Sequence, residues 1–347
     1  MAGRTTLGLV TAALIGLAVY AWALAPPGPV TVMREAPADA APALRLARYG
    51  HTSVVLGRHL YVLGGIHGTR PTRDVERATI WPDGRLGPFT AVPGLALSHA
   101  RAGHTSVVVG DRLYVIGGRD GAGFLGSVEQ AIIGPDGELG SFSPVPGIDL
   151  ATPRGSATGA VVGGHLYVMG GHGDGGILQS VERSAIDADG RIGPFASVAG
   201  LALGAPRTCH TGVAIGPSVY VLGGVDASGR ILRSVERATL ALDGTLGPFR
   251  RQGAALQTPR STPSSLIADG FLYVIGGADN ARTTFASIER APVRPDGVLG
   301  AFAPWPYSLA SPRSFHSSVE AHGSLYVLGG QDRHFLLTRD VERLRLK

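Results

Sequence analysis

The sequence predicts an all-β protein built as a six-bladed β-propeller, a closed ring of four-stranded blades. A five-residue string, Tyr-Val-(Leu/Ile/Met)-Gly-Gly, occurs six times, and consecutive copies are always 53 residues apart, as between Tyr61 and Tyr114 (114 − 61 = 53). Each period holds four short apolar runs separated by turn residues. The 52 glycines, 24 prolines and only 16% charged residues also suit short strands joined by tight turns.

The second repeat shows the expected elements in order. A β-rich run over 104–109 ends at a Gly-Asp turn, and a second strand over 112–116 ends at the paired glycines. After a variable loop, a third strand starts near Ser127 and leads to an Asp-Gly turn at 136–137. A fourth segment opens with Leu-Gly-Ser-Phe at 139–142, where most other repeats have Leu-Gly-Pro-Phe or a close variant. Two hairpins per repeat make one propeller blade.

Every repeat also carries one arginine ahead of its first strand and one glutamate in its third strand. Side chains required in every blade usually hold blades together, and partly buried Arg–carboxylate pairs do so with bidentate geometry. We therefore expect six structural ion pairs rather than an ion-binding ring. The residues are Arg48, Arg101, Arg154, Arg207, Arg260 and Arg313, with Glu76, Glu129, Glu182, Glu236, Glu289 and Glu342.

Ring closure is expected to involve the N-terminal segment. The sixth repeat reaches Lys347 without the Asp-Gly turn and fourth segment of the others, while residues 30–47 occupy that phase ahead of Arg48. We expect a strand over 30–33 or 43–46 to complete the sixth blade, because pairing it would remove the exposed edges of an open ring.

The first 29 residues differ from the propeller region, 30–347. Arg4 precedes an uncharged stretch over 5–25 that is long enough to cross a bilayer as a helix. This pattern predicts an N-terminal hydrophobic helix that acts as a signal-anchor, with the propeller on the exported side of the membrane in the cell envelope. Cleavage after 23–25, which would leave a secreted or periplasmic protein, stays open, although Pro26 would then follow the cut.

Charge and cysteine content exclude some classes of protein. The formal charge of +5 rests almost wholly on arginine, since Lys347 is the only lysine, and the arginines form no run. A nucleic-acid-binding surface would be more clustered, so we expect no nucleic-acid partner. The single cysteine, Cys209, excludes an internal disulfide framework.

The paired glycines after an apolar strand, the tyrosine before them and the arginine ahead of the first strand resemble kelch repeats. The resemblance covers residues 48–347. It departs from the kelch pattern where a fourth-strand tryptophan is usual, because the Leu-Gly-Pro-Phe motif takes that place here. The resemblance implies a six-bladed propeller of the bacterial exported type.

Repeat lengths vary on one face only. The interval from the first glycine of the pair to the glutamate is 12 residues in the third repeat (170 to 182) and 13 in the fourth (223 to 236). The connection from the motif phenylalanine to the next arginine shortens after the fourth repeat. Both segments end on the same side of a four-stranded meander, and variable loops on a rigid scaffold commonly form binding sites.

We therefore predict a ligand-binding face rich in arginine, which suits a carboxylate, a phosphate or an acidic peptide. Solvated loop charge with no ligand is the open alternative. By the kelch resemblance, the residue before each first strand would rim the central opening. The predicted residues are Arg70, Arg73, Arg119, Arg230, Arg233, Arg282, Phe315, Arg333 and His334.

Two inner positions are candidates for chemistry. Glu320 stands in a column that is otherwise apolar, so it is either an acid in the central channel or an exposed residue of the last blade. Cys209 is either a small buried residue or, beside His210, a nucleophile. His51, His104, His210 and His316 share one phase, and we expect them to be structural rather than a metal site.

The sequence contains no P-loop, HExxH or GxSxG motif and no Cys/His metal spacing, so we expect no cofactor and no metal. We predict a membrane-anchored, non-catalytic binding scaffold whose partner is a protein, an anionic glycan or a small acidic ligand. The alternative is a sugar-modifying enzyme resembling sialic acid mutarotases, with Glu320 and a loop arginine or His334 as its acid and base. A kelch-type copper oxidase would need a crosslinkable Cys–Tyr pair and histidine ligands that we do not find.

Overall fold

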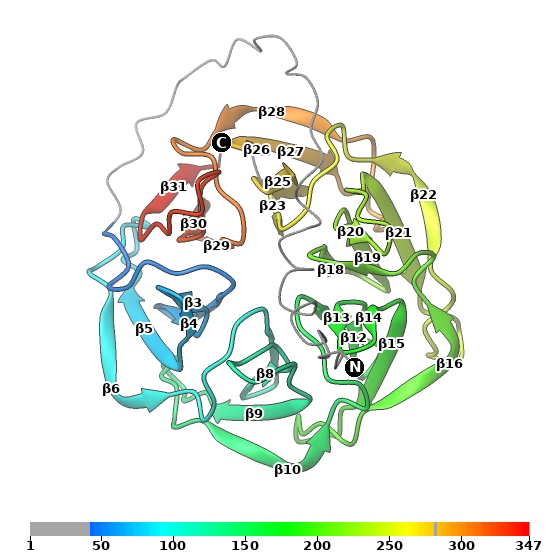
Figure 1. Cartoon of the computed structure of the whole chain (residues 1–347), viewed down its shortest axis with the longest axis horizontal. Coiled ribbons are helices and arrows are strands. Elements are labelled where there is room, and N and C mark those ends of the chain that lie inside the picture. The colour runs from blue at the N-terminus through cyan, green and yellow to red at the C-terminus, as the bar shows by residue number, and fades with distance from the viewer. Residues whose placement is uncertain (1–41, 281–282, 347) are drawn as a thin grey trace, which may run out of the picture.

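The computed structural model describes residues 42–280 and 283–346, which form six blades around a central axis (Figure 1). The described residues contain strands and turns but no helix. Blade 1 consists of β1 (Thr52–Leu56), β2 (His59–Leu63), β5 (Asp74–Thr79) and β6 (Thr90–Ala96). Blade 2 consists of β7 (Thr105–Val109), β8 (Arg112–Ile116), β9 (Ser127–Ile132) and β10 (Ser143–Asp149). Blade 3 consists of β11 (Thr158–Val162), β12 (His165–Met169), β15 (Ser180–Ala185) and β16 (Ala196–Ala202).

The second half of the ring repeats this plan. Blade 4 consists of β18 (Thr211–Ile215), β19 (Ser218–Leu222), β21 (Ser234–Thr239) and β22 (Arg250–Ala255). Blade 5 consists of β23 (Ser264–Ala268), β24 (Phe271–Ile275), β27 (Ser287–Pro292) and β28 (Ala303–Ser308). Blade 6 consists, within the described residues, of β29 (Ser317–Ala321), β30 (Ser324–Leu328) and β31 (Val341–Arg345).

Short hairpins and bridges extend the connections between strands. They are β3 (Ile66–His67) with β4 (Arg70–Pro71), β13 (His172–Gly173) with β14 (Gly176–Ile177), β17 (Arg207–Thr208) with β20 (Val225–Asp226), and β25 (Ala278–Asn280) with β26 (Thr283–Thr284). The first strand of each blade lies beside the axis and the fourth lies at the perimeter (Figure 1). The predicted order of strands is therefore confirmed, with one shift: the fourth strand of blade 2 begins after Phe142, and Leu139 forms only a bridge to Ile133.

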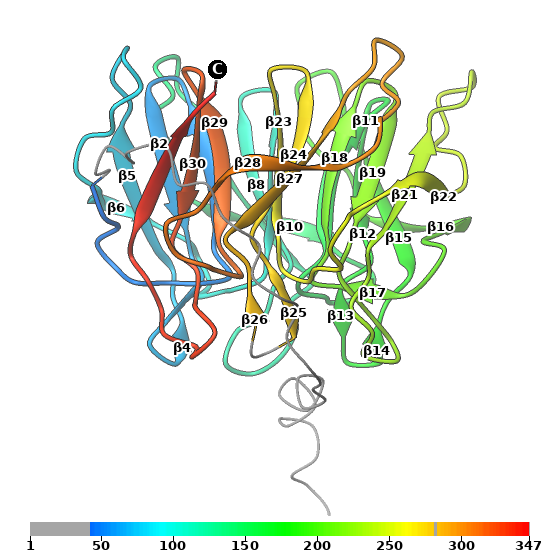
Figure 2. The same ribbon diagram turned by 90° about the horizontal axis from the view of Figure 1, so that it is seen from above.

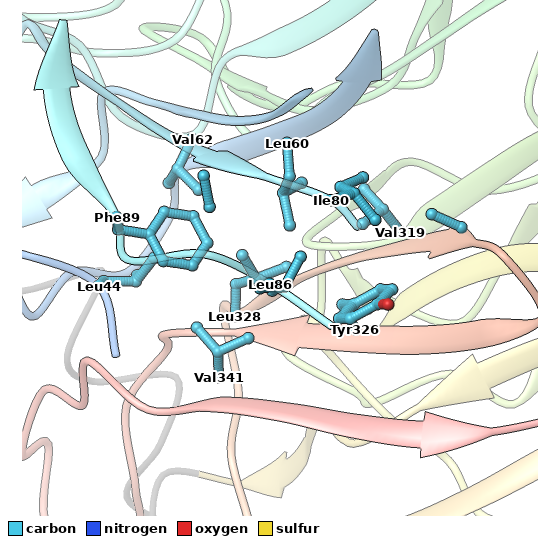
Figure 3. Close-up of a cluster of buried hydrophobic side chains, with 12 residues drawn as sticks. Leu44, Leu60, Val62, Ile80, Leu86, Phe89, Val319, Tyr326, Leu328 and Val341 are labelled. Atoms are coloured by element: carbon cyan, nitrogen blue, oxygen red, sulfur yellow. The ribbon is translucent and has the colours of Figure 1, made fainter. Parts of the chain in front are cut away.

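Hydrophobic clusters fill the spaces between neighbouring blades. Between blades 6 and 1, the side chains of Leu60 and Phe89 meet those of Tyr326 and Leu328 (Figure 3). The equivalent phenylalanine of each following blade packs against the blade before it. These residues are Phe142, Phe195, Phe249 and Phe302. The Leu-Gly-Pro-Phe segment is thus an anchor between blades.

The six predicted ion pairs are confirmed, and their burial is complete rather than partial. In blade 3, Nη2 of Arg154 lies 2.5 Å from Oε1 of Glu182, with both side chains fully buried. The Glu182 carboxylate also accepts hydrogen bonds from the backbone amides of Ala151 and Thr152. These two residues belong to the segment that connects blade 2 to blade 3. Each pair therefore fixes the incoming connection to its own blade. The other pairs are Arg48–Glu76, Arg101–Glu129, Arg207–Glu236, Arg260–Glu289 and Arg313–Glu342.

The expected strand over 43–46 is wrong. Leu44 lies 53 residues before Leu97 (97 − 44 = 53), which follows the fourth strand of blade 1 rather than belonging to it. Residues 43–46 accordingly act as a link between blades: Leu44 joins the cluster between blades 6 and 1, and the amides of Arg45 and Leu46 bind the Glu76 carboxylate. The alternative strand over 30–33 lies outside the described residues.

The predicted anchor over 5–25 also lies outside the described residues. Among residues 42–280 and 283–346, no helix has the length and apolar character that crossing a membrane requires.

Candidate functional site

The loops that join second to third strands project from one face of the ring. The β3–β4, β13–β14 and β25–β26 hairpins all lie on this side, opposite the tight hairpin turns (Figure 2). The connections from one blade to the next end on the same side, as the repeat lengths predicted. We call it the loop face, defined by residues 64–73, 117–126, 170–179, 223–233, 276–280 with 283–286, and 329–340.

Six residues, one from each blade, close a hydrogen-bonded ring around the axis at the loop face. They are Gly50, Gly103, Ser156, Cys209, Thr262 and Phe315, and we call them the axial ring. Each amide donates to the carbonyl oxygen of its counterpart in the preceding blade at 2.7–3.2 Å, and Gly50 closes the ring by donating to Phe315 at 2.9 Å. All six have φ between 51° and 63°, which is the left-handed region. Four side chains accept a conformation that usually costs a non-glycine residue about 1 kcal/mol or more.

A cavity of about 120 Å³ lies at the axis. It is lined by the axial ring and by the residue that follows each ring member, which is His51, His104, Ala157, His210, Pro263 or His316. Pockets that enclose a whole small-molecule ligand usually measure roughly 300–1,000 Å³. The cavity therefore has room for a single side-chain-sized group, and a larger ligand has to lie on the loop face outside it.

The four histidines give the cavity uncharged walls. Burial, together with the nearby arginine of the same blade, lowers the pKa of His104 and His210 to about 3. The pKa of His316 is likewise lowered to about 3, and that of His51 falls well below its usual value. Nε2 of His104 lies 2.9 Å from the Thr52 hydroxyl. Within the described ranges, no group of three or more His, Cys, Asp or Glu residues is placed to bind a metal ion.

Aromatic rings and one arginine lie in the segments next to the axial ring. Tyr49 packs edge-on against Phe315, with ring centroids 5.6 Å apart, and Phe124 lies against His172 at 5.1 Å. Arg119 forms backbone bridges to Ala102 and to Phe124. We call Tyr49, Arg119, Phe124, His172 and Phe315 the axial rim.

The charge of Arg119 affects the pKa values of two other residues of the axial rim, Tyr49 and His172. Burial lowers the pKa of His172, and the Arg119 guanidinium lowers it further. Burial raises the pKa of Tyr49, and Arg119 opposes that rise. Arg119 is exposed and forms no ion pair with a carboxylate in the part of the chain that the structure describes. An exposed guanidinium without an ion-pair partner can bind a carboxylate in a bidentate manner.

The predicted binding residues fall into an axial and a peripheral group. Arg119 and Phe315 stand at the axial rim, whereas Arg282 lies outside the described residues. The remaining residues occupy outer parts of the loops or the starts of third strands, namely Arg70, Arg73, Arg230, Arg233, Arg333 and His334. Arg230 is paired with Asp226 at 3.0 Å, and Nε of Arg333 lies 3.0 Å from Nε2 of His334.

Three rim residues, Tyr49, Phe124 and His172, were absent from the predicted set. Tyr49 occupies a phase where the other repeats have Ala102, Gly155, Thr208, Ser261 and Ser314, so a search for the single aromatic residue in a column of small ones would have found it. Phe124 lies in a variable loop, and only the fold brings it to His172.

The structure separates the proposed catalytic set. Glu320 is exposed near the end of β29, and its Oε1 accepts the amide of Gly323 in the following turn at 3.0 Å. His334 follows β30, at the opposite end of the blade. A five-residue strand spans about 16 Å, so the two groups do not meet. Glu320 is thus exposed and does not stand beside His334.

Cys209 belongs to the axial ring and is half-buried. Burial raises the pKa of its thiol, although contacts with the Thr208 and Ser156 hydroxyls oppose the rise. The thiol is therefore protonated near neutral pH, and neighbouring His210, which is itself uncharged, does not activate it.

Comparisons with known proteins agree with this architecture. The Kelch motif matches residues 47–77, 100–130, 153–183 and 206–237. The chain is similar to a solved structure titled "Structure of YjhT", with a TM-score of 0.67 and 14% identity over 88% of this chain and 97% of that one. At that identity the likeness shows the fold alone. No curated protein shows significant sequence similarity to the chain. The four motif matches and the six described blades together support a β-propeller built from kelch repeats.

Proposed function

We propose that this propeller is a non-catalytic binding scaffold that holds an anionic partner, either an acidic protein segment or an anionic glycan, on its loop face. The observation that carries the proposal is the position of Arg119. Arg119 is exposed in the loop face, forms no ion pair with a carboxylate among the described residues, and carries a charge that influences the pKa values of Tyr49 and His172. Such a group binds carboxylates or phosphates, while the aromatic rings supply contact area.

The chemistry of the site supports binding over catalysis. The cavity walls are uncharged, the Cys209 thiol is protonated, and no residue of the axial ring or axial rim carries a carboxylate. The alternative, a sugar-modifying enzyme resembling sialic acid mutarotases, needs an acid and a base close to the ring oxygen and the anomeric hydroxyl. Glu320 and His334 lie at opposite ends of blade 6 and do not supply that pair.

Binding can be tested with the full chain in a thermal-shift and calorimetry screen of acidic peptides, neutral peptides, sialic acid and neutral sugars. A ligand present at about 100 times its Kd should stabilise the fold by roughly 2.7 kcal/mol. Arg119→Ala should remove that stabilisation, whereas Arg58→Ala is a matched control, because Arg58 is an exposed arginine beside the β1–β2 turn on the opposite face.

Two outcomes would overturn the proposal. One is a screen in which no anionic compound shifts the melting temperature. The other is an equal loss of binding in Arg119→Ala and Arg58→Ala, which would indicate a general effect of positive charge. Anomerisation of sialic acid that is faster with the protein than without it, followed by NMR, would favour the enzyme.

We also propose that the propeller lies on the exported side of a membrane, held by residues 5–25. The support is the uncharged length of that stretch after Arg4. Fractionation of cells expressing the full chain, with and without residues 1–29, tests the proposal. Recovery of the full chain in the membrane pellet after carbonate washing is expected, and a fully soluble chain that retains its N-terminus would contradict it.

A further inference from the structure

We propose that the axial cavity is a specificity pocket that admits one small uncharged side chain of a protein partner, and that Gly50 and Gly103 keep it open. The inference rests on the proposed function and adds a second point of contact beside Arg119. It assigns a different role to each part of the site: Arg119 selects a negative charge at the rim, and the cavity selects a neutral group at the axis.

The two glycines are not required by the backbone. The φ of Gly50 is 63° and that of Gly103 is 61°, and four other members of the axial ring adopt nearly the same φ with a side chain, as Ser156 does at 52°. A Cβ added to Gly50 would find its nearest atom, the amide nitrogen of Gly103, at 3.5 Å, which is ordinary van der Waals contact. A Cβ added to Gly103 would meet the Ser156 hydroxyl at 3.2 Å.

Gly65 of the same blade, by contrast, is required by packing. A Cβ on Gly65 would lie 2.8 Å from both the Cβ of His51 and the carbonyl oxygen of Tyr49, so a side chain is excluded there. No such barrier exists at Gly50. The missing side chains at Gly50 and Gly103 therefore open the blade 1–blade 2 side of the axial ring, next to the axial rim.

The lining of the cavity selects against charge. The imidazoles of His104, His210 and His316 are neutral at physiological pH because their pKa values lie at about 3. All six amides of the axial ring are already donating within the ring, so they are not free to bind an anion. The arginines nearest the cavity are buried and paired with glutamates. A carboxylate or an ammonium would lose its hydration here without gaining an opposite charge.

Hydroxyl groups in the lining still offer hydrogen bonds to a neutral polar group, because a hydroxyl can both donate and accept. Ser156 and Thr262 contribute these hydroxyls. A carboxamide, as in asparagine, matches this mixture of donors and acceptors and the size of the cavity. A protein partner is favoured over a glycan because Phe335 and Leu336, 53% and 65% exposed, extend the loop face with apolar surface.

The single cysteine of the chain lies in the cavity and can report on it. Cys209 in the full-length protein would be labelled with methyl methanethiosulfonate, which is small and neutral, and with the 2-sulfonatoethyl and 2-trimethylammonioethyl analogues. Each rate would be divided by the rate for the same protein unfolded in urea, which removes differences in intrinsic reactivity. We expect the normalised rate for the neutral reagent to exceed that of either charged reagent by about tenfold or more.

Protection by small solutes then identifies the preferred group. Acetamide should slow the neutral labelling severalfold, whereas acetate and methylammonium should leave it unchanged. Gly50→Ser and, separately, Gly103→Ser should abolish the protection, because each places a side chain in the opening. Gly68→Ser is the matched control: Gly68 has φ of 60° in the β3–β4 loop, and an added Cβ would meet no atom within 4 Å.

Several results would overturn the inference: equal normalised rates for charged and neutral reagents, protection by acetate as strong as by acetamide, or protection that survives both glycine substitutions. Stronger protection by N-acetylglucosamine than by N-acetyl-asparaginamide would assign the cavity to a glycan instead of a protein. These measurements need no partner, so they can fail while Arg119-dependent binding holds, and binding can fail while the selectivity of the cavity holds.

Discussion

The amide of Gly330 donates a hydrogen bond to the carbonyl oxygen of Arg48 at 2.8 Å and so joins the last blade to the first. The same contact joins blade 1 to blade 2, where the amide of Gly65 binds the carbonyl oxygen of Arg101 at 2.9 Å. The junction that closes the ring therefore uses the same hydrogen bond as a junction within it. Stability at each junction then depends on the local packing and hydrogen bonds of two neighbouring blades.

The repeated tyrosines provide a comparison within one molecule. The hydroxyl of Tyr220 donates to the carbonyl oxygen of Gly297 in the next blade at 2.8 Å, whereas the buried hydroxyl of Tyr167 has no partner among the described residues. Tyr220→Phe should lower the free energy of unfolding by about 0.5–1.5 kcal/mol, the usual net worth of a buried hydrogen bond. Tyr167→Phe should be neutral or stabilising, because it removes an unpaired polar group. Urea denaturation of the two variants measures both effects, and equal losses would show that the Tyr220 hydrogen bond adds nothing.

Substitution of one residue of a buried ion pair should lower the free energy of unfolding far more than loss of a tyrosine hydrogen bond. Arg154→Met would leave the Glu182 carboxylate fully buried without its cation and would also remove the hydrogen bond from Arg154 to Gly170. Removal of one partner of a buried pair usually costs about 3–5 kcal/mol. We expect a loss of that size in urea denaturation, and partial recovery in Arg154→Met/Glu182→Gln, which removes the stranded charge.

A surface ion pair is the matched control for that experiment. Arg85 and Asp83 lie 2.6 Å apart in the Asp-Gly turn of blade 1, but both side chains are more than half exposed. Arg85→Met should change the free energy of unfolding by less than about 1 kcal/mol. A similar loss in Arg85→Met and Arg154→Met would contradict the structural role assigned to the buried pairs.

Substitution of a paired glycine should lower the free energy of unfolding far more than substitution of a loop glycine. Gly118 has φ of 98°, and an added Cβ would lie 2.9 Å from the carbonyl oxygen of Ala102 and 3.0 Å from the Cβ of His104. Gly118→Ala therefore requires movement of backbone and should cost roughly 1–3 kcal/mol or more in urea denaturation. Gly68→Ala, at a position with φ of 60° and no atom nearby, should cost only about 1 kcal/mol for the strained φ. A cost no larger at Gly118 than at Gly68 would mean that the contact of Gly118 with Ala102 and His104 within blade 2 adjusts freely.

The blades could be predicted from the sequence because each repeat buries the same side chains. Tyr61 and its equivalents recur every 53 residues since each faces the next blade, and a repeated requirement leaves a repeated letter. Departures from the repeat are harder to interpret. The expected strand at 43–46 was wrong because Leu44 occupies the same position in the repeat as Leu97. Leu97 comes after the fourth strand of blade 1.

The candidate site was predictable only in part for a physical reason. Phe315 and Arg119 could be predicted because each differs from the residues at the same position of the other repeats. The axial ring, by contrast, is a tertiary feature. Its hydrogen bonds join residues about 53 positions apart, and its left-handed φ is adopted by Cys209 and Thr262, residues that seldom adopt it. The kelch resemblance placed these residues at the central opening, but no local pattern in the sequence marks such a conformation, so the hydrogen bonds and the left-handed φ of the ring became visible only in the fold.

The four buried histidines should make the protein sensitive to acid. The pKa of His210 falls from 6.5 to about 3 on folding, because burial and the nearby Arg207 disfavour the charged form. A group with a lowered folded pKa contributes stability that is complete above its unfolded pKa and is lost as the pH falls toward the folded value. The free energy of unfolding should therefore drop below a pH of about 6.5, by up to about 1.4 kcal/mol per pH unit for each histidine.

Blade 3 supplies the matched variant for this experiment, because Ala157 occupies the histidine phase there and its blade is intact. His210→Ala should reduce the slope of unfolding free energy against pH between about 6.5 and 4 by up to about 1.4 kcal/mol per pH unit, which is the contribution of one histidine. His165→Ala is the control, because His165, the first residue of β12, is only partly buried and its Nδ1 lies 2.9 Å from the carbonyl oxygen of Gly163. Urea denaturation across this pH range measures the slopes. An unchanged slope in His210→Ala would show that folding does not lower the pKa of this imidazole, which would contradict the buried environment assigned to it.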